Sequence, residues 1–187
     1  AVNDLIKASK EKDTISITLN GAKVLPATVL SEIKGKDISL NLDMENGFIW
    51  KINGTSITAE TPADTDLSVT NTAEHIPAAL YSLISTNQND FGFHLGRSGA
   101  FDFPAVLSVK ADGSCAGLMA NLFWYDVENG VLQCIQTVTV GGAFERSIPY
   151  ADFTLSKGQD YFIAFGIESL NGRVIHTDGS ITDENGA

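Results

Sequence analysis

Basic residues are scarce in this chain. Lys and Arg number 12 against 23 Asp and Glu, which gives a formal net charge of −11, and charged residues make up only 19% of the sequence. Nucleic acids and anionic membrane surfaces attract proteins through basic side chains. The composition therefore argues against nucleic acid as a partner, and we interpret the acidic surface mainly as a source of solubility.

Long apolar runs are also missing. No stretch approaches the roughly 20 apolar residues that a transmembrane helix needs, so we expect no membrane insertion. The N-terminal segment, residues 1–13, is short, polar and mixed in charge, and so is unlike a signal peptide. If the protein is secreted, we expect this chain to be a processed or excised fragment.

Cysteine is limited to Cys115 and Cys134. The two flank a predicted hairpin, but a register centred on its turn does not place them opposite each other. A disulfide and a pair of buried free thiols are both left open. Their spacing is not that of metal ligands.

The sequence does contain many short strand patterns separated by turn dipeptides. Residues 14–19 alternate apolar and polar side chains, which is typical of a half-buried strand, and Asn20-Gly21 follows as a hairpin-type turn. Pro26 opens a predicted helix over 27–34, and Ile76-Pro77 opens a second one that runs to Ser85. This mixture predicts a mainly β or α+β fold.

The segment Thr61-Pro62-Ala63-Asp64 interrupts the pattern and predicts a boundary. We expect two small antiparallel β lobes, each with one short helix, over residues 1–60 and 64–168, followed by a polar tail or linker start over 169–187. The segment Leu25-Pro26-Ala27 and the predicted strands that follow it are similar in pattern to Ile76-Pro77-Ala78 and the predicted strands that follow that segment. The two lobes therefore suggest a diverged internal duplication.

Residue patterns for catalysis or cofactor binding are absent, so we predict no catalytic residue, no bound metal, no cofactor and no enzyme activity. His75, His94 and His176 lie on separate predicted elements. We expect His94 to face solvent from a strand and His75 to lie near a helix start. Carboxylate pairs such as Asp126 and Glu128 flank turns, where Asp stabilises the backbone. Acidic residues in the tail and near residues 64–66 leave a calcium site as a minor alternative to the prediction of no metal. These residues do not have the spacing of an EF-hand loop.

Aromatic residues on hairpins give the positive functional indication. Trp50 lies between two Asn-Gly turns, and Trp124 and Tyr125 are neighbours on a predicted strand. An exposed ring on a sheet can stack on the apolar face of a sugar. We take Tyr125 first, then Trp50 and Trp124, as candidate glycan-stacking residues, with burial of both tryptophans in the lobe cores as the alternative.

An ordered set of segments carries a family resemblance over most of residues 13–166. It includes Leu25-Pro26-Ala27-Thr28-Val29-Leu30, Trp50-Lys51-Ile52-Asn53-Gly54, Asn121-Leu122-Phe123-Trp124-Tyr125 and Asp160-Tyr161-Phe162-Ile163. Together these resemble β-rich modules of cell-surface and dockerin-bearing, cellulosome-type proteins of Gram-positive gut and rumen anaerobes. The resemblance implies an extracellular or cell-surface, multidomain parent protein and brings no catalytic residues.

Two functions are consistent with these observations. The first is a carbohydrate-binding or adhesive module, whose partner is a plant or bacterial polysaccharide. The second is a structural spacer or protein-docking module that contacts neighbouring domains of the parent protein. Exposed aromatics in a groove would favour the first, and fully buried tryptophans would favour the second.

Overall fold

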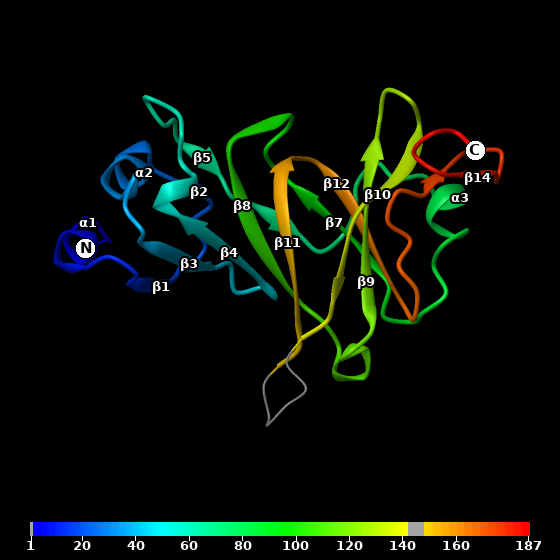
Figure 1. The fold of residues 1–187 in the computed structure, drawn as a ribbon, viewed down its shortest axis with the longest axis horizontal. Helices are drawn as coiled ribbons and strands as arrows, with labels where there is room; N and C mark the ends of the chain where they lie inside the picture. The colour runs from blue at the N-terminus through cyan, green and yellow to red at the C-terminus, as the bar shows by residue number, and fades with distance from the viewer. Residues whose placement is uncertain (1, 142–147) are drawn as a thin grey trace. The chain divides into compact units, whose positions relative to one another are not determined.

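The computed structural model describes residues 2–141 and 148–187, which form a mainly β fold with few, short helices (Figure 1). This confirms the predicted fold class. The helices are α1 (Val2–Ala8), α2 (Ala27–Ile33) and α3 (Ala78–Tyr81), with short 3-10 turns η1 (Gly54–Ser56) and η2 (Gly113–Cys115). The sequence predicted no helix at α1, and α3 ends earlier than expected.

The described residues form three sheets. A five-stranded sheet has the order β1 (Thr14–Thr18), β3 (Ser39–Asp43), β4 (Phe48–Asn53), β8 (Ala100–Lys110), β11 (Tyr150–Lys157). A seven-stranded sheet has the order β14 (Ile181–Thr182), β13 (Val174–Ile175), β10 (Val131–Thr139), β9 (Met119–Asp126), β12 (Asp160–Gly166), β7 (Phe91–Leu95), β6 (Val69–Thr70). Strands β2 (Val24–Leu25) and β5 (Thr65–Asp66) pair separately.

The chain divides into two compact units, and both are discontinuous in sequence. Unit 1 comprises Ala1–Val69, Leu95–Val109 and Thr154–Gly158, and unit 2 comprises Thr70–His94, Lys110–Phe153 and Gln159–Ala187. The predicted lobes, 1–60 and 64–168, therefore do not match these units. An interruption of the strand pattern in the sequence indicates a loop. It does not show which strands, distant in sequence, pair to complete a sheet.

Strands β1 and β3 pair in parallel, with Ile15 opposite Leu40 and Ile17 opposite Leu42. The expectation of antiparallel lobes is therefore wrong for this strand pair. A parallel pair needs a crossover connection, usually helical, and α2 lies in the connection between these two strands. Its apolar stripe, which includes Leu30 and Ile33, is fully buried.

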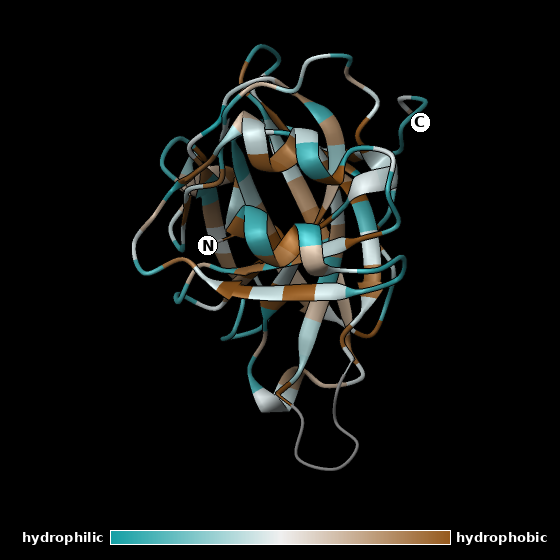
Figure 2. Ribbon diagram, turned by 90° about the vertical axis from the view of Figure 1, so that its left-hand side faces the viewer, coloured by the Kyte–Doolittle hydropathy of each residue, from teal (hydrophilic) through white to brown (hydrophobic). Residues whose placement is uncertain are grey.

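Alternation of side chains along the strands builds the core of unit 1. In β3 and β4, Leu40, Leu42, Trp50 and Ile52 are almost completely buried, while their neighbours in sequence are half-buried. The alternation is visible as brown and paler bands along strands in Figure 2. The apolar side chains at these alternate positions therefore face the core, and the residues between them are partly exposed.

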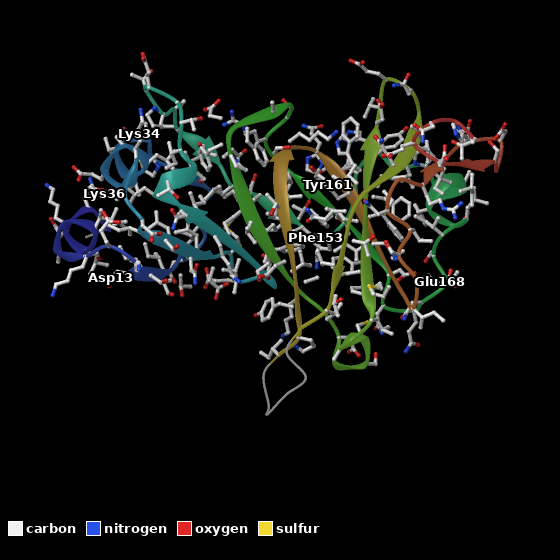
Figure 3. The ribbon with its side chains drawn as sticks, in the orientation of Figure 1. Asp13, Lys34, Lys36, Phe153, Tyr161 and Glu168 are labelled. Atoms are coloured by element: carbon white, nitrogen blue, oxygen red, sulfur yellow. The ribbon has the colours of Figure 1, made fainter. Side chains whose placement is uncertain are left out.

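The structure does not show a duplication. Strands β3 and β4 form an antiparallel hairpin, but the corresponding strands β7 and β8 belong to different sheets. Strand β7 pairs instead with β12, where Phe93 stacks on Tyr161 at a centroid distance of 5.1 Å (Tyr161 is labelled in Figure 3). The turn dipeptide Ser98-Gly99, which lies between β7 and β8, therefore belongs to a connection between two sheets rather than to a hairpin.

Residues 169–187 are folded as part of unit 2, so the prediction of a linker start is wrong. Strand β13 pairs with β10 and β14 pairs with β13. Ile175 is buried, and Leu170 packs against the same apolar cluster. The polar residues that suggested a tail form turns instead. Asp178 accepts hydrogen bonds from Ser180, and Asp183 accepts them from the main chain near the C-terminus.

Candidate functional site

Trp50 belongs to the core of unit 1. Its side chain is 2% exposed, its Nε1 donates a hydrogen bond to the carbonyl of Leu67 at 2.9 Å, and Phe101 packs edge-on against the ring. A sugar cannot reach a face of this ring. The assignment of Trp50 as a stacking residue is therefore corrected in favour of the core alternative.

Trp124 and Tyr125 are both half-buried on β9. Consecutive residues of a strand point to opposite faces, so the two rings do not form one platform. Tyr125 packs against the apolar cluster of unit 2 and lies opposite Leu132. Their role as glycan-stacking residues stays a prediction.

A polar hollow of about 530 Å³ lies on the outward face of the five-stranded sheet, within unit 1. The register explains its composition, because Ser16, Asn41, Lys51 and Val106 form one row across β1, β3, β4 and β8. The hollow is lined by Thr14, Ser39, Asn41, Lys51, Ile52, Asn53, Ser56, Pro104, Ala105, Val106 and Thr154. The same alternation that buries Leu40 and Leu42 places these polar side chains on the outward face, and no site was predicted there from the sequence.

One wall of the polar hollow is fixed by internal hydrogen bonds. The side-chain amide of Asn53 donates to Asp37 and to the hydroxyl of Ser39, and its Oδ1 accepts from the backbone N–H and the hydroxyl of Thr55. The side-chain amide of Asn41, by contrast, has no hydrogen-bond partner among the described residues and is half-buried. Asn41 therefore offers both a donor and an acceptor to a ligand in the hollow.

A second polar cluster, in unit 2, surrounds the buried carboxylate of Asp160. Asp160 begins β12 and lies directly opposite His94 of β7. Its Oδ1 accepts hydrogen bonds from Nδ1 of His94 at 3.0 Å and from the backbone N–H of Glu74 at 2.8 Å, and its Oδ2 accepts from Nδ1 of His75 at 2.6 Å. The side chain of Asp160 is 1% exposed, whereas those of Glu74 and His75 are about half exposed.

His94 is not the solvent-facing strand residue that its position predicted, because its side chain is only 12% exposed. Period-two alternation places it correctly on the face opposite Phe93, but that face is covered by the loop that carries Glu74 and His75. Asp160 was missed because its place after Lys157-Gly158-Gln159 is typical of a turn residue. The partners are 66 and 85 residues away from it in sequence, so no local motif connects them.

Asp160 is ionised in this environment. Burial by itself would raise the pKa of its carboxyl, but the hydrogen bonds from the Glu74 N–H, His75 and His94 outweigh it and lower the pKa below the usual range. An ionised carboxylate only accepts hydrogen bonds, so both histidines donate through Nδ1. With Nδ1 of both rings bonded to Asp160, Nε2 is the ring nitrogen that remains to bind a ligand.

Other residues singled out in the sequence have structural partners. Cys115 and Cys134 are buried free thiols rather than a disulfide. Asp126 accepts hydrogen bonds from Glu128 and Asn129 in the β9–β10 turn, as expected of a turn carboxylate. In the described part of the chain, no helix has the length and apolar character needed to cross a membrane.

Comparisons with protein-family models, with curated proteins and with solved structures gave no significant match to this chain.

Proposed function

We propose that this chain is a non-catalytic, extracellular or cell-surface module that binds polysaccharide through the polar hollow of unit 1. The observation that carries the proposal is the half-buried amide of Asn41, which lines that hollow. It lies between Ser16 and Lys51 in one cross-strand row, and no described residue satisfies it. The extracellular location rests on the resemblance of residues 13–166 to surface and cellulosome-type modules.

The chemistry of the hollow suits a sugar. Amide and hydroxyl side chains can both donate to and accept from sugar hydroxyls, and Thr14, Ser39 and Asn41 supply such groups from neighbouring strands. Pro104 and Val106 add apolar surface for the C–H faces of a pyranose ring. Because the groups lie on paired strands with their backbone fixed, little ordering is required when a ligand binds.

Retention on insoluble plant and bacterial polysaccharides, together with a glycan array, tests the proposal. We expect binding that persists at high salt, since hydrogen bonds between neutral groups are not screened like ion pairs. Asn41→Ala should weaken it by about tenfold, the equivalent of a net hydrogen-bond contribution near 1.4 kcal/mol. The melting temperature should stay close to that of the wild type.

Two control variants separate the alternatives. Ser180→Ala removes an exposed hydroxyl of unit 2 and should leave retention unchanged. Tyr125→Ala tests the stacking prediction: if it abolishes retention while Asn41→Ala does not, the glycan site lies on β9 and the polar hollow is not the site.

A structural spacer or protein-docking module is the second candidate. The complete burial of Trp50 favours it, because buried tryptophan was the expected mark of a module without a glycan platform. Failure of the wild-type chain to bind any polysaccharide would reject the glycan proposal and leave this one.

A further inference from the structure

We propose that Glu74, His75 and His94 form a binding site for a divalent transition-metal ion, with zinc as the expected occupant. One nitrogen of each imidazole and one carboxylate oxygen of Glu74 all lie within 4.8 Å of one another. Nε2 of His94 and Oε2 of Glu74 are already 3.8 Å apart. Two imidazoles and one carboxylate are a ligand set that zinc uses in proteins.

Asp160 prepares this ligand set. A histidine that binds a metal through one ring nitrogen usually donates its other N–H to a carboxylate or a carbonyl, which fixes the ring and its tautomer. Here a single buried carboxylate accepts from Nδ1 of both His75 and His94. Nε2 is therefore the nitrogen that each ring presents to an ion.

The third ligand is tied to the same carboxylate through the backbone. The N–H of Glu74 donates to Oδ1 of Asp160 at 2.8 Å, so the loop before α3 is fixed relative to β7 and β12. The Glu74 side chain is 52% exposed and free to rotate toward the imidazoles. Asp160 is thus a positioning residue, and Glu74 is a ligand.

The Glu74–His94 pair requires only a small adjustment, because Oε2 of Glu74 and Nε2 of His94 are 3.8 Å apart. Zn–N and Zn–O bonds of about 2.0–2.2 Å in a tetrahedral site place neighbouring ligand atoms roughly 3.4 Å apart. Because the side chains of Glu74 and His75 are about half exposed, they can close the remaining gap without disturbing the core. Their exposure also leaves the fourth position open to water.

The local charge favours a cation. Two carboxylates, those of Glu74 and Asp160, face two imidazoles, and among the described residues their ion-pair partners are these histidines rather than Lys or Arg. Imidazole ligands favour zinc and related transition ions, whereas calcium and magnesium prefer sites made entirely of oxygen. The expected selectivity is therefore for Zn²⁺ and Co²⁺ over Ca²⁺ and Mg²⁺.

Titration of the tag-free, metal-depleted chain with Zn²⁺ by calorimetry, and with Co²⁺ by visible absorption, tests the site. We expect one ion per chain and a rise in melting temperature with added Zn²⁺. Removal of outer partners of metal-bound histidines typically weakens metal affinity by about 10- to 100-fold. Loss of a ligand in His75→Ala or Glu74→Gln should weaken it at least as much, roughly 100-fold for His75→Ala.

His176→Ala is the matched control, because His176 lies outside the cluster and bonds to Thr182. It should leave affinity and stoichiometry unchanged. Histidine nitrogen NMR provides a second readout: added Zn²⁺ should shift Nε2 of His75 and His94, while both Nδ1 atoms stay protonated.

The proposal is overturned if the wild-type chain binds no Zn²⁺ or Co²⁺. It is also overturned if His75→Ala and Glu74→Gln, shown by circular dichroism to be folded, bind as tightly as the wild type. Equal binding of Ca²⁺ that does not depend on His75 would likewise exclude the imidazole site.

Discussion

Replacement of Trp50 separates a core role from a ligand-binding role. In Trp50→Phe, the aromatic contact with Phe101 is largely kept, but the hydrogen bond from Nε1 to the Leu67 carbonyl is lost. A buried carbonyl left without its partner costs about 1–3 kcal/mol. Trp50→Ala removes the ring as well, and such truncations in a core cost about 3–5 kcal/mol. We therefore expect a graded loss of stability.

Urea unfolding followed by far-ultraviolet circular dichroism measures the free energy of unfolding. Native-state hydrogen exchange at the amides of Leu40 and Leu42 assigns the loss to the five-stranded sheet, since it reports the opening of that part of the structure. Polysaccharide retention by Trp50→Phe should equal that of the wild type. A loss below about 1 kcal/mol in Trp50→Ala would refute the core assignment, and loss of retention by a stably folded Trp50→Phe would restore the stacking interpretation.

Three further outcomes follow from the packing. Gly54→Ala should destabilise unit 1 by more than the roughly 1–3 kcal/mol of ordinary overpacking, because its Cβ would meet the carbonyl of Ile33, whereas Gly113→Ala has open space and should be neutral in thermal unfolding. Ile175→Ala should cost about 2–5 kcal/mol in urea unfolding, and no effect would return the C-terminal segment to a frayed tail. The thiols of Cys115 and Cys134 should resist iodoacetamide at pH 8 until the chain is unfolded, because burial raises the pKa of both thiols, to about 11 for Cys134; rapid native labelling would contradict their burial.

Local structure could be predicted from the sequence where the residues that determine an element lie within the element itself. The β3–β4 hairpin is such a case: Leu40 and Leu42 alternate with polar residues, and Gly47 supplies the positive φ of the turn. Helix α2 follows Pro26 with three buried apolar residues. These elements needed no knowledge of distant partners.

Strand partners could not be predicted in the same way. The pattern of residues 91–103 is that of a hairpin, yet β7 pairs with β12 and β8 with β4. The choice depends on the stack of Phe93 on Tyr161 and on the polar contact between His94 and Asp160, which join residues far apart in sequence. The same limitation hid the histidine cluster, since each member alone looked like a surface or turn residue.

The pair of Asp160 and His94 also specifies how β7 and β12 align. Residues of neighbouring strands alternate in side-chain direction, so a one-residue slip would move every side chain to the other face. Asp160 would then lie opposite Phe93 or Leu95, without the imidazole that now bonds to it, and a buried carboxylate without its partners is strongly destabilising. The correct register instead places Phe93 on Tyr161 and satisfies Asp160 through His94, His75 and the Glu74 N–H. The hydrogen bonds that orient both histidines therefore arise from folding itself, and an incoming metal ion would find its nitrogen ligands already oriented.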